Sequence, residues 1–277
     1  QAAVRRDIPI EFINKFDVIY ITGGMHDVPV ISLNWKRFSQ KKVIWRSIGQ
    51  SNKDTEKNLS PFKNQGMKVV RCSPKERLLP NYMGEHAVIR FYKDPEEFKD
   101  WNGNTKQVIN VSQSLKSRRN HCHYNEIMTL MQGHPAKVYG SGNEDLGALS
   151  GGEINFQNLK EQYRDNRVFV YGGTWPAPYT LTFVEAWLTG IPVVSLGKQL
   201  AEHPPGVSPV DVFEFYEIHE MIKHGENGFI SDNVETLKKD VGLLMSDHTI
   251  AKKISTNGRQ SAIDYFGKEL LRQVAEA

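Results

Sequence analysis

A repeated alternation of short apolar runs with helical segments is the feature that most constrains the fold of this chain. Four apolar runs lie in its first 94 residues: FDVIYITGG (16–24), KKVIWRSIG (41–49), GMKVVRCS (66–73) and EHAVIRFYKD (85–94). Strands separated by helices form a parallel sheet covered on both faces, because each crossover between parallel strands needs a long connection. We therefore predict a doubly wound α/β unit in this part of the chain.

A polar stretch with Pro and Gly at residues 95–107 interrupts the pattern, and the alternation then resumes. The later apolar runs are QVINVSQS (107–114), AKVYGSGN (136–143), RVFVYGG (167–173) and IPVVSLG (191–197). The sequence therefore predicts two Rossmann-like domains with doubly wound parallel sheets, at residues 1–100 and 101–277. In such sheets ligands bind at the carboxyl ends of the strands, so we expect a cleft where the two domains face each other. The last helix is expected to start near residue 249 and to cross back toward the first domain.

The composition is that of an ordinary globular protein, with 39% hydrophobic and 24% charged residues. The net charge of +3 is too small to indicate nucleic-acid binding by itself, although it suits an anionic small ligand. No apolar run approaches the roughly 18 residues that span a bilayer, and no signal-peptide pattern opens the chain. Two cysteines, Cys72 and Cys122, fit a reducing compartment. A cytoplasmic location is expected, with peripheral attachment to a membrane surface as a variant of it.

Neighbouring metal-ligating residue types occur at His121, Cys122 and His123. Adjacent ligands converge poorly on one ion, and no second cluster completes a tetrahedral set. No metal is therefore expected, and the stretch is interpreted as a polar segment before a helix.

Basic, hydroxyl and glycine residues follow the first strands of the second domain. Lys116, Arg118 and Arg119 lie after the first of them, and Gly140 and Ser141 after the next. A diphosphate is bound by cations, backbone N–H groups and helix N-termini, which this composition could supply. The alternatives are a solvated basic loop and a plain turn after a strand.

Glu185 lies about one turn into a predicted helix, with Phe183, Val184, Ala186 and Trp187 around it. A carboxylate among apolar neighbours needs solvent or a hydrogen-bonding partner, and two vicinal ribose hydroxyls would be a suitable one. The alternative is a glutamate that complements the positive end of the helix dipole.

Four blocks of the second domain resemble retaining glycosyltransferases of the GT-B fold, the group 1 or family 4-like enzymes. The blocks are NFQNLKEQYRDNRVFVYGG, TLTFVEAWLTGIPVVSLG, HEMIKHGENGFISDNVETLKKDVGLLMSD and ISTNGRQSAIDYFGKELL, which follow the family's order within residues 107–277. The resemblance implies a hexosyltransferase-like enzyme (EC 2.4) that moves a sugar from a nucleotide-diphosphate sugar to an acceptor. It also implies retention of anomeric configuration and no metal or other cofactor.

The resemblance also implies residue roles. Glu185 matches the second glutamate of the family's E-x7-E motif, which holds the donor ribose, whereas the first glutamate is replaced by Ala177. Glu220 matches a glutamate whose role is mainly structural. The expected substrate-binding residues are Ser114, Arg118, Gly140, Ser141, Tyr179, Thr180, Leu181, Thr182 and Glu185, and the expected catalytic residues are Lys116, Arg119 and His26.

The amino-terminal domain departs from the family. Where the family has histidines in its first strand, this chain has Tyr20 and Thr22, and His26 is the substitute, unless it is a surface-loop histidine. The family's first βα unit with its Gly-rich loop is not found, so we expect the chain to lack that opening. Two rivals follow: a non-catalytic relative that binds a nucleotide-sugar or a partner protein, and an inverting, epimerase-like relative that uses His26 or Asp27.

The sequence does not fix the donor or the acceptor. UDP- and GDP-linked donors are both compatible with it. A glycan, a lipid-linked glycan, a small metabolite and a modified nucleic acid are all compatible acceptors. The oligomeric state is equally open.

Overall fold

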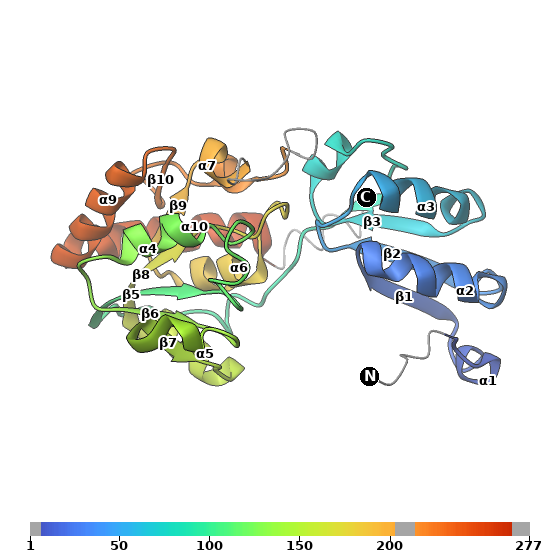
Figure 1. Ribbon diagram of the computed structural model, residues 1–277, viewed down its shortest axis with the longest axis horizontal. Helices are drawn as coiled ribbons and strands as arrows, with labels where there is room; N and C mark the ends of the chain where they lie inside the picture. Colours follow the sequence, from blue (N-terminus) through green and yellow to red (C-terminus); the bar gives the residue numbers. More distant parts are fainter. Residues whose placement is uncertain (1–6, 203–213, 268–277) are drawn as a thin grey trace. The chain divides into compact units, whose positions relative to one another are not determined.

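The computed structural model describes residues 7–202 and 214–267. The chain divides into two compact units, each with its own sheet (Figure 1). The first unit comprises residues 1–90 and 213–215, and the second comprises residues 91–212 and 216–277. The segment 91–100, expected in the first domain, thus packs with the second unit. In the described part of the chain no helix is both long and apolar enough to cross a membrane.

The first unit is a sheet of four parallel strands in the order β1-β2-β3-β4. Its elements are α1 (Ile10–Ile13), β1 (Val18–Gly23), η1 (Met25–Asp27), α2 (Val28–Phe38), β2 (Lys42–Ser47), α3 (Lys53–Asn64), β3 (Lys68–Arg71), η2 (Pro74–Leu78) and β4 (Ala87–Val88). Large apolar side chains such as Trp35, Trp45 and Leu59 fill its core. All four expected strands are present, although the fourth is only two residues long.

A buried charged network lies at the carboxyl ends of β2 and β3. Arg71 ends β3 without any exposed surface and bonds both carboxylate oxygens of Glu56, at 2.8 and 2.7 Å. Its Nη1 also lies 3.4 Å from Glu76, which accepts the hydroxyl proton of Ser47 at 2.7 Å. The Arg71 guanidinium stands 5.3 Å from the Trp45 ring. Burial raises the pKa of the Glu76 carboxyl despite these partners. The network joins α3 and η2 to the strand ends.

The second unit has six parallel strands in the order β10-β9-β8-β5-β6-β7. The strands are β5 (Thr105–Val111), β6 (Ala136–Tyr139), β7 (Ser150–Gly152), β8 (Asn166–Tyr171), β9 (Val193–Leu196) and β10 (Phe229–Ser231). The chain runs from β5 outward to β7 and then returns to β8 on the other side of β5. This reversal makes the carboxyl ends of β5 and β8 the topological switch point, which is where open α/β sheets bind ligands.

Helices surround this sheet in two groups, with α4 packed beside α9, and α6 packed beside α5 and α10. The helices are α4 (Tyr124–Met131), η3 (Glu144–Leu149), α5 (Phe156–Asp165), α6 (Leu181–Thr189), α7 (Lys198–Glu202), α8 (Ile218–Met221), α9 (Val234–Ser246) and α10 (His248–Phe266). Asn233 caps α9 as its position predicts, accepting from the Thr236 N–H at 3.1 Å. Within residues 214–225 the helical part is α8 alone. The expected crossing of the last helix lies outside the described residues.

The polar stretch between the two series of strands is held against the rest of the second unit by hydrogen bonds. Arg259 of α10 donates to the carbonyl of Pro95 at 2.9 Å and also to the carbonyls of Phe98 and Leu188. The indole N–H of Trp101 donates to the carbonyl of Asn166 at 2.8 Å. We call residues 91–104 the linker segment; these contacts attach it to α6, α10 and the start of β8.

Candidate functional site

Two loops at the carboxyl edge of the second sheet are joined through one buried side chain, Asn143. Its amide nitrogen donates to the carbonyls of Ser112 at 2.7 Å and Gly140 at 2.9 Å, while its oxygen accepts the N–H of Leu115 at 2.8 Å. The N–H of Ser114 donates to the carbonyl of Ser141 at 2.9 Å. The structure thus brings together Ser114, Gly140 and Ser141.

Glycine at position 140 has a steric cause in this arrangement. Gly140 has a φ of +128°, and a Cβ built there would stand 2.5 Å from the carbonyl oxygen of Ser112. Ser114 also has a positive φ, +48°, which is uncommon for a residue other than glycine. The glycine-rich sequence after β6 is therefore explained by the close approach of the two loops.

The three expected cations all lie in the loop that follows β5, and all are exposed. Arg119 donates to the Asn125 amide oxygen at 2.6 Å and stands 5.1 Å from the ring of Tyr124. Lys116 lies 3.7 Å from Asp145, in an exposed pair that contributes little to stability. The charge of Arg118 lowers the pKa of the Cys122 thiol, against the larger effect of burial, which raises it. The loop after β5 thus carries three cations at the carboxyl edge of the second sheet, where the switch point lies.

The same loop contacts the segment after β8. The N–H of Trp175 donates to the carbonyl of His121 at 2.8 Å, and the two rings lie 5.8 Å apart. His123 is buried beside Gly172, where a Cβ on the glycine would come within 3.1 Å of it. Burial first, and then the charge of His121, lower the pKa of His123 to about 4. In the described part of the chain no three His, Cys, Asp or Glu residues converge as a metal would require.

Helix α6 begins at this edge with a hydroxyl cap. Thr180 accepts from the N–H of Phe183 at 3.4 Å and shares a hydrogen bond with the Thr182 hydroxyl at 2.8 Å. Tyr179 is buried, and its hydroxyl accepts the N–H of Phe91 at 3.0 Å. Leu181, the first residue of the helix, is 42% exposed, whereas Phe183 and Val184 in the same turn are buried. The N–H groups at the start of a helix have no acceptor within the helix itself, and they favour an anion there.

Ala177, which replaces the first glutamate of the motif, is buried. Its N–H donates to the carbonyl of Thr174 at 2.7 Å, which closes a turn in the loop before α6. An alanine side chain has no hydrogen-bonding group, so this position cannot supply the carboxylate of the resembled motif.

Glu185 is 5% exposed and has a partner that sequence reasoning missed. One of its carboxylate oxygens lies 2.6 Å from the ammonium of Lys93, in the linker segment. Burial raises the pKa of Glu185, and the hydrogen bond and charge of Lys93 partly oppose this rise. The apolar neighbours of Glu185 were a signal that a partner exists, but nothing in the sequence places Lys93, 92 positions earlier, against it.

His26 and Asp27 belong to the first unit, whereas the other candidate residues belong to the second. Both lie just after β1, where His26 is exposed and Asp27 is half-buried. Burial raises the pKa of the Asp27 carboxyl. A half-buried carboxyl with a raised pKa at a strand end suits proton transfer.

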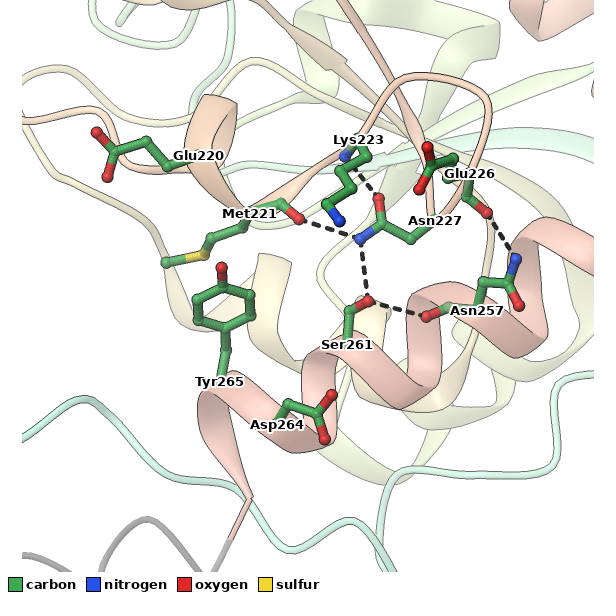
Figure 2. Close-up of a pocket in the computed structure, with 9 residues that line it drawn as sticks. All are labelled: Glu220, Met221, Lys223, Glu226, Asn227, Asn257, Ser261, Asp264 and Tyr265. Atoms are coloured by element: carbon green, nitrogen blue, oxygen red, sulfur yellow. Dashed lines mark hydrogen bonds between the residues drawn. The ribbon is translucent and has the colours of Figure 1, made fainter.

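A separate cavity of about 280 Å³ lies between α10 and the turn before β10 (Figure 2). Asn227 organises its wall: its amide nitrogen donates to the carbonyl of Met221 at 3.0 Å and to the Ser261 hydroxyl at 2.9 Å, and its oxygen accepts the N–H of Lys223 at 2.7 Å. Asn227 begins the sequence Asn-Gly-Phe, and these bonds give it a structural role that explains why an asparagine stands there. Glu220 also lines this cavity, with about half of its side chain exposed.

Comparison with solved structures identifies proteins of the same fold. HepE of Anabaena, in complex with UDP, matches 96% of this chain and 79% of its own, with a TM-score of 0.67 and 15% identity. A glycosyltransferase from Rickettsia africae matches 96% of this chain and 78% of its own, with a TM-score of 0.64 and 16% identity. TarM of S. aureus, in complex with fondaparinux, α-GlcNAc-glycerol and UDP, matches 96% of this chain and 57% of its own, with a TM-score of 0.62 and 15% identity.

Likeness at this level of identity establishes the fold, and the two parallel sheets are those of GT-B glycosyltransferases, as the sequence predicts. No protein-family model matches the chain, and no curated protein matches it either.

Proposed function

We propose that this protein is a glycosyltransferase that moves a sugar from a nucleotide-diphosphate sugar to an acceptor. The observation that carries the proposal is the carboxyl edge of the second sheet, where a loop with three exposed cations joins the loops after β6 and β8. The fold supports it, because HepE was crystallised with UDP, and this chain has the same fold.

The roles follow from the chemistry of the leaving group. Departure of a nucleoside diphosphate develops negative charge, which preplaced cations and backbone N–H groups stabilise. Lys116, Arg118 and Arg119 would supply the cations, and the first turn of α6 would supply N–H groups. Glu185 would accept the ribose hydroxyls and so hold the donor in position. We propose retention without a metal, and product anomer analysis by NMR tests it, because inversion would favour Asp27 or His26 as a base.

Nucleotide titration tests the donor site. Isothermal titration of UDP and GDP should show binding by the wild type, weakened about tenfold or more in Glu185→Gln and in the Arg118→Ala, Arg119→Ala double variant. Lys252→Ala, which removes an exposed charge from α10, is the control and should bind as the wild type does. Unchanged affinity in both site variants would overturn the donor-site assignment.

One observation favours a second function, that of a non-catalytic nucleotide-sugar-binding protein. The buried Ala177 leaves the loop before α6 without the carboxylate of the related motif. Incubation with UDP-glucose and GDP-linked sugars, followed by assays for transfer and for donor hydrolysis, separates the two functions. Nucleotide binding without either reaction would establish the second. We propose a cytoplasmic location, because a chain with only two cysteines, Cys72 and Cys122, suits a reducing compartment.

A further inference from the structure

The ion pair between Lys93 and Glu185 lies beside two aromatic rings. The Lys93 ammonium lies 5.6 Å from the ring of Phe98 and 5.3 Å from the ring of Phe156, the first residue of α5. Only 23% of the Lys93 side chain and 7% of the Glu185 side chain are exposed. Two aromatic faces and a carboxylate therefore hold the ammonium in one place.

Several charged and titratable groups surround Glu185. Lys93 and Glu97 reach it from the linker segment, and Glu97 raises its pKa. On α5, Tyr163 is fully buried with a pKa raised mainly by burial, and Lys160 is paired with Glu97 at 3.0 Å. Among the described residues, Lys93 thus directly opposes the effect of burial on the pKa of Glu185.

We propose that Lys93 is a positioning residue for the donor site: it keeps Glu185 ionised and fixes the direction of its carboxylate toward the ribose. The inference rests on the proposed function, because it assigns a helper to the ribose-binding carboxylate. An ionised carboxylate accepts hydrogen bonds at both oxygens, about four in all. Lys93 occupies one of these positions, which leaves enough acceptors for two vicinal hydroxyls.

The effect of removing Lys93 can be predicted because burial raises the pKa of Glu185 and Lys93 lowers it. Without Lys93 the pKa of Glu185 should rise further, because burial would act with no opposing charge. A protonated carboxyl group is a weaker acceptor than a carboxylate, so selectivity for a ribose should be lost at a higher pH in such a variant.

The experiment compares UDP with 2′-deoxy-UDP by isothermal titration between pH 5 and 8. The wild type should favour UDP. In Lys93→Met we expect the ratio of the two affinities to fall about tenfold near the acid end and to recover as the pH rises. Lys93→Arg should behave as the wild type does, since it restores the charge. Lys99→Met removes an exposed lysine from the same segment and should leave the ratio unchanged.

Two results would overturn the inference. One is a pH midpoint of ribose selectivity that is the same in Lys93→Met and the wild type; the other is a wild type that binds UDP and 2′-deoxy-UDP equally. Either would leave UDP binding, and with it the proposed function, intact. Failure of the wild type to bind either UDP or GDP would overturn both. Should Lys93→Met not fold, Lys93→Gln, which keeps a hydrogen-bond donor without the charge, takes its place in the same titration.

Discussion

One histidine of the second unit, His123, has an unusual backbone conformation and an unusual pKa. His123 is 2% exposed, adopts a left-handed backbone conformation and carries a pKa of about 4. Its Nδ1 has no hydrogen-bond partner among the described residues. The imidazole is therefore neutral in the folded protein at pH 5 to 8.

The lowered pKa of His123 makes stability depend on pH. Between about pH 4 and the ordinary value of 6.5 the unfolded state binds the proton and the folded state does not, so stability is lost as the pH falls through this window. We expect the unfolding free energy of the wild type to fall by about 2 kcal/mol relative to His123→Asn between pH 6.5 and 5. Urea unfolding at both pH values measures this difference.

Asparagine is the substitute because it tolerates a left-handed backbone conformation. Comparing the two proteins at each pH cancels the opposite effect of the buried carboxyl groups, whose pKa values are raised. Parallel pH profiles for the wild type and the variant would contradict the buried neutral state of His123.

At the scale of elements, the loop after β6 owes its shape to Gly140. An alanine there would meet the Ser112 carbonyl and would also adopt an unfavourable backbone conformation. We expect Gly140→Ala to destabilise the protein by about 3 kcal/mol and to weaken nucleotide binding. Gly133→Ala is the matched control: its φ is +86° with open space around the Cβ, so only about 1–2 kcal/mol should be lost. Equal losses in urea unfolding would show that the loops do not constrain each other.

Arg259 is one of the residues that attach the linker segment to the second unit. Removing its guanidinium leaves three carbonyls without that donor, one of them at the carboxyl end of α6. We expect Arg259→Ala to cost about 3 kcal/mol and to speed amide hydrogen exchange in residues 95–104. Gln260→Ala, on the exposed side of the same helix, should change stability by less than about 0.5 kcal/mol. Exchange rates in the linker segment that match the wild type would contradict this role.

The sequence predicts those elements whose causes are local. The runs that became β1, β2, β5, β8 and β9 are apolar and end at small residues, and Asn233 and Thr180 are readable helix caps. The short strands β7 and β10 are not predicted, because a run of three residues is too short to show the hydrophobic pattern of a strand. Helix α3 is largely polar and has Pro61 inside it, so its apolar stripe is weak.

Prediction of the candidate site stops where contacts become long-range. Spacing places Glu185 in a helix, but its partner Lys93 lies near the end of a run that is predicted as a strand of the other domain. Asn143 is similarly visible only as part of a turn, although it joins two loops through three hydrogen bonds. Such pairings depend on which strands become neighbours, which a single sequence does not encode locally.

At the scale of the whole molecule, each unit has its own apolar core. The first unit also encloses the Arg71 network. The proposed function uses residues of the second unit and assigns this network no role. Replacing Arg71 leaves Glu56 and Glu76 buried without their cation, which typically costs about 3–5 kcal/mol. The stability of the first unit can therefore be changed through this network, and that of the second unit through nucleotide binding.

We accordingly expect two separable unfolding transitions. Arg71→Met should lower the stability of the first unit alone, whereas UDP at about one hundred times its dissociation constant should raise that of the second by about 2.7 kcal/mol. Native-state hydrogen exchange resolves the two, because β2 and β8 report on different units. Arg77→Met, which breaks an exposed pair with Glu85 in the first unit, is the control and should cost less than about 1 kcal/mol. If Arg71→Met lowered protection equally in both strands, the units would unfold as one cooperative body, and a nucleotide bound to the second would then stabilise the first as well.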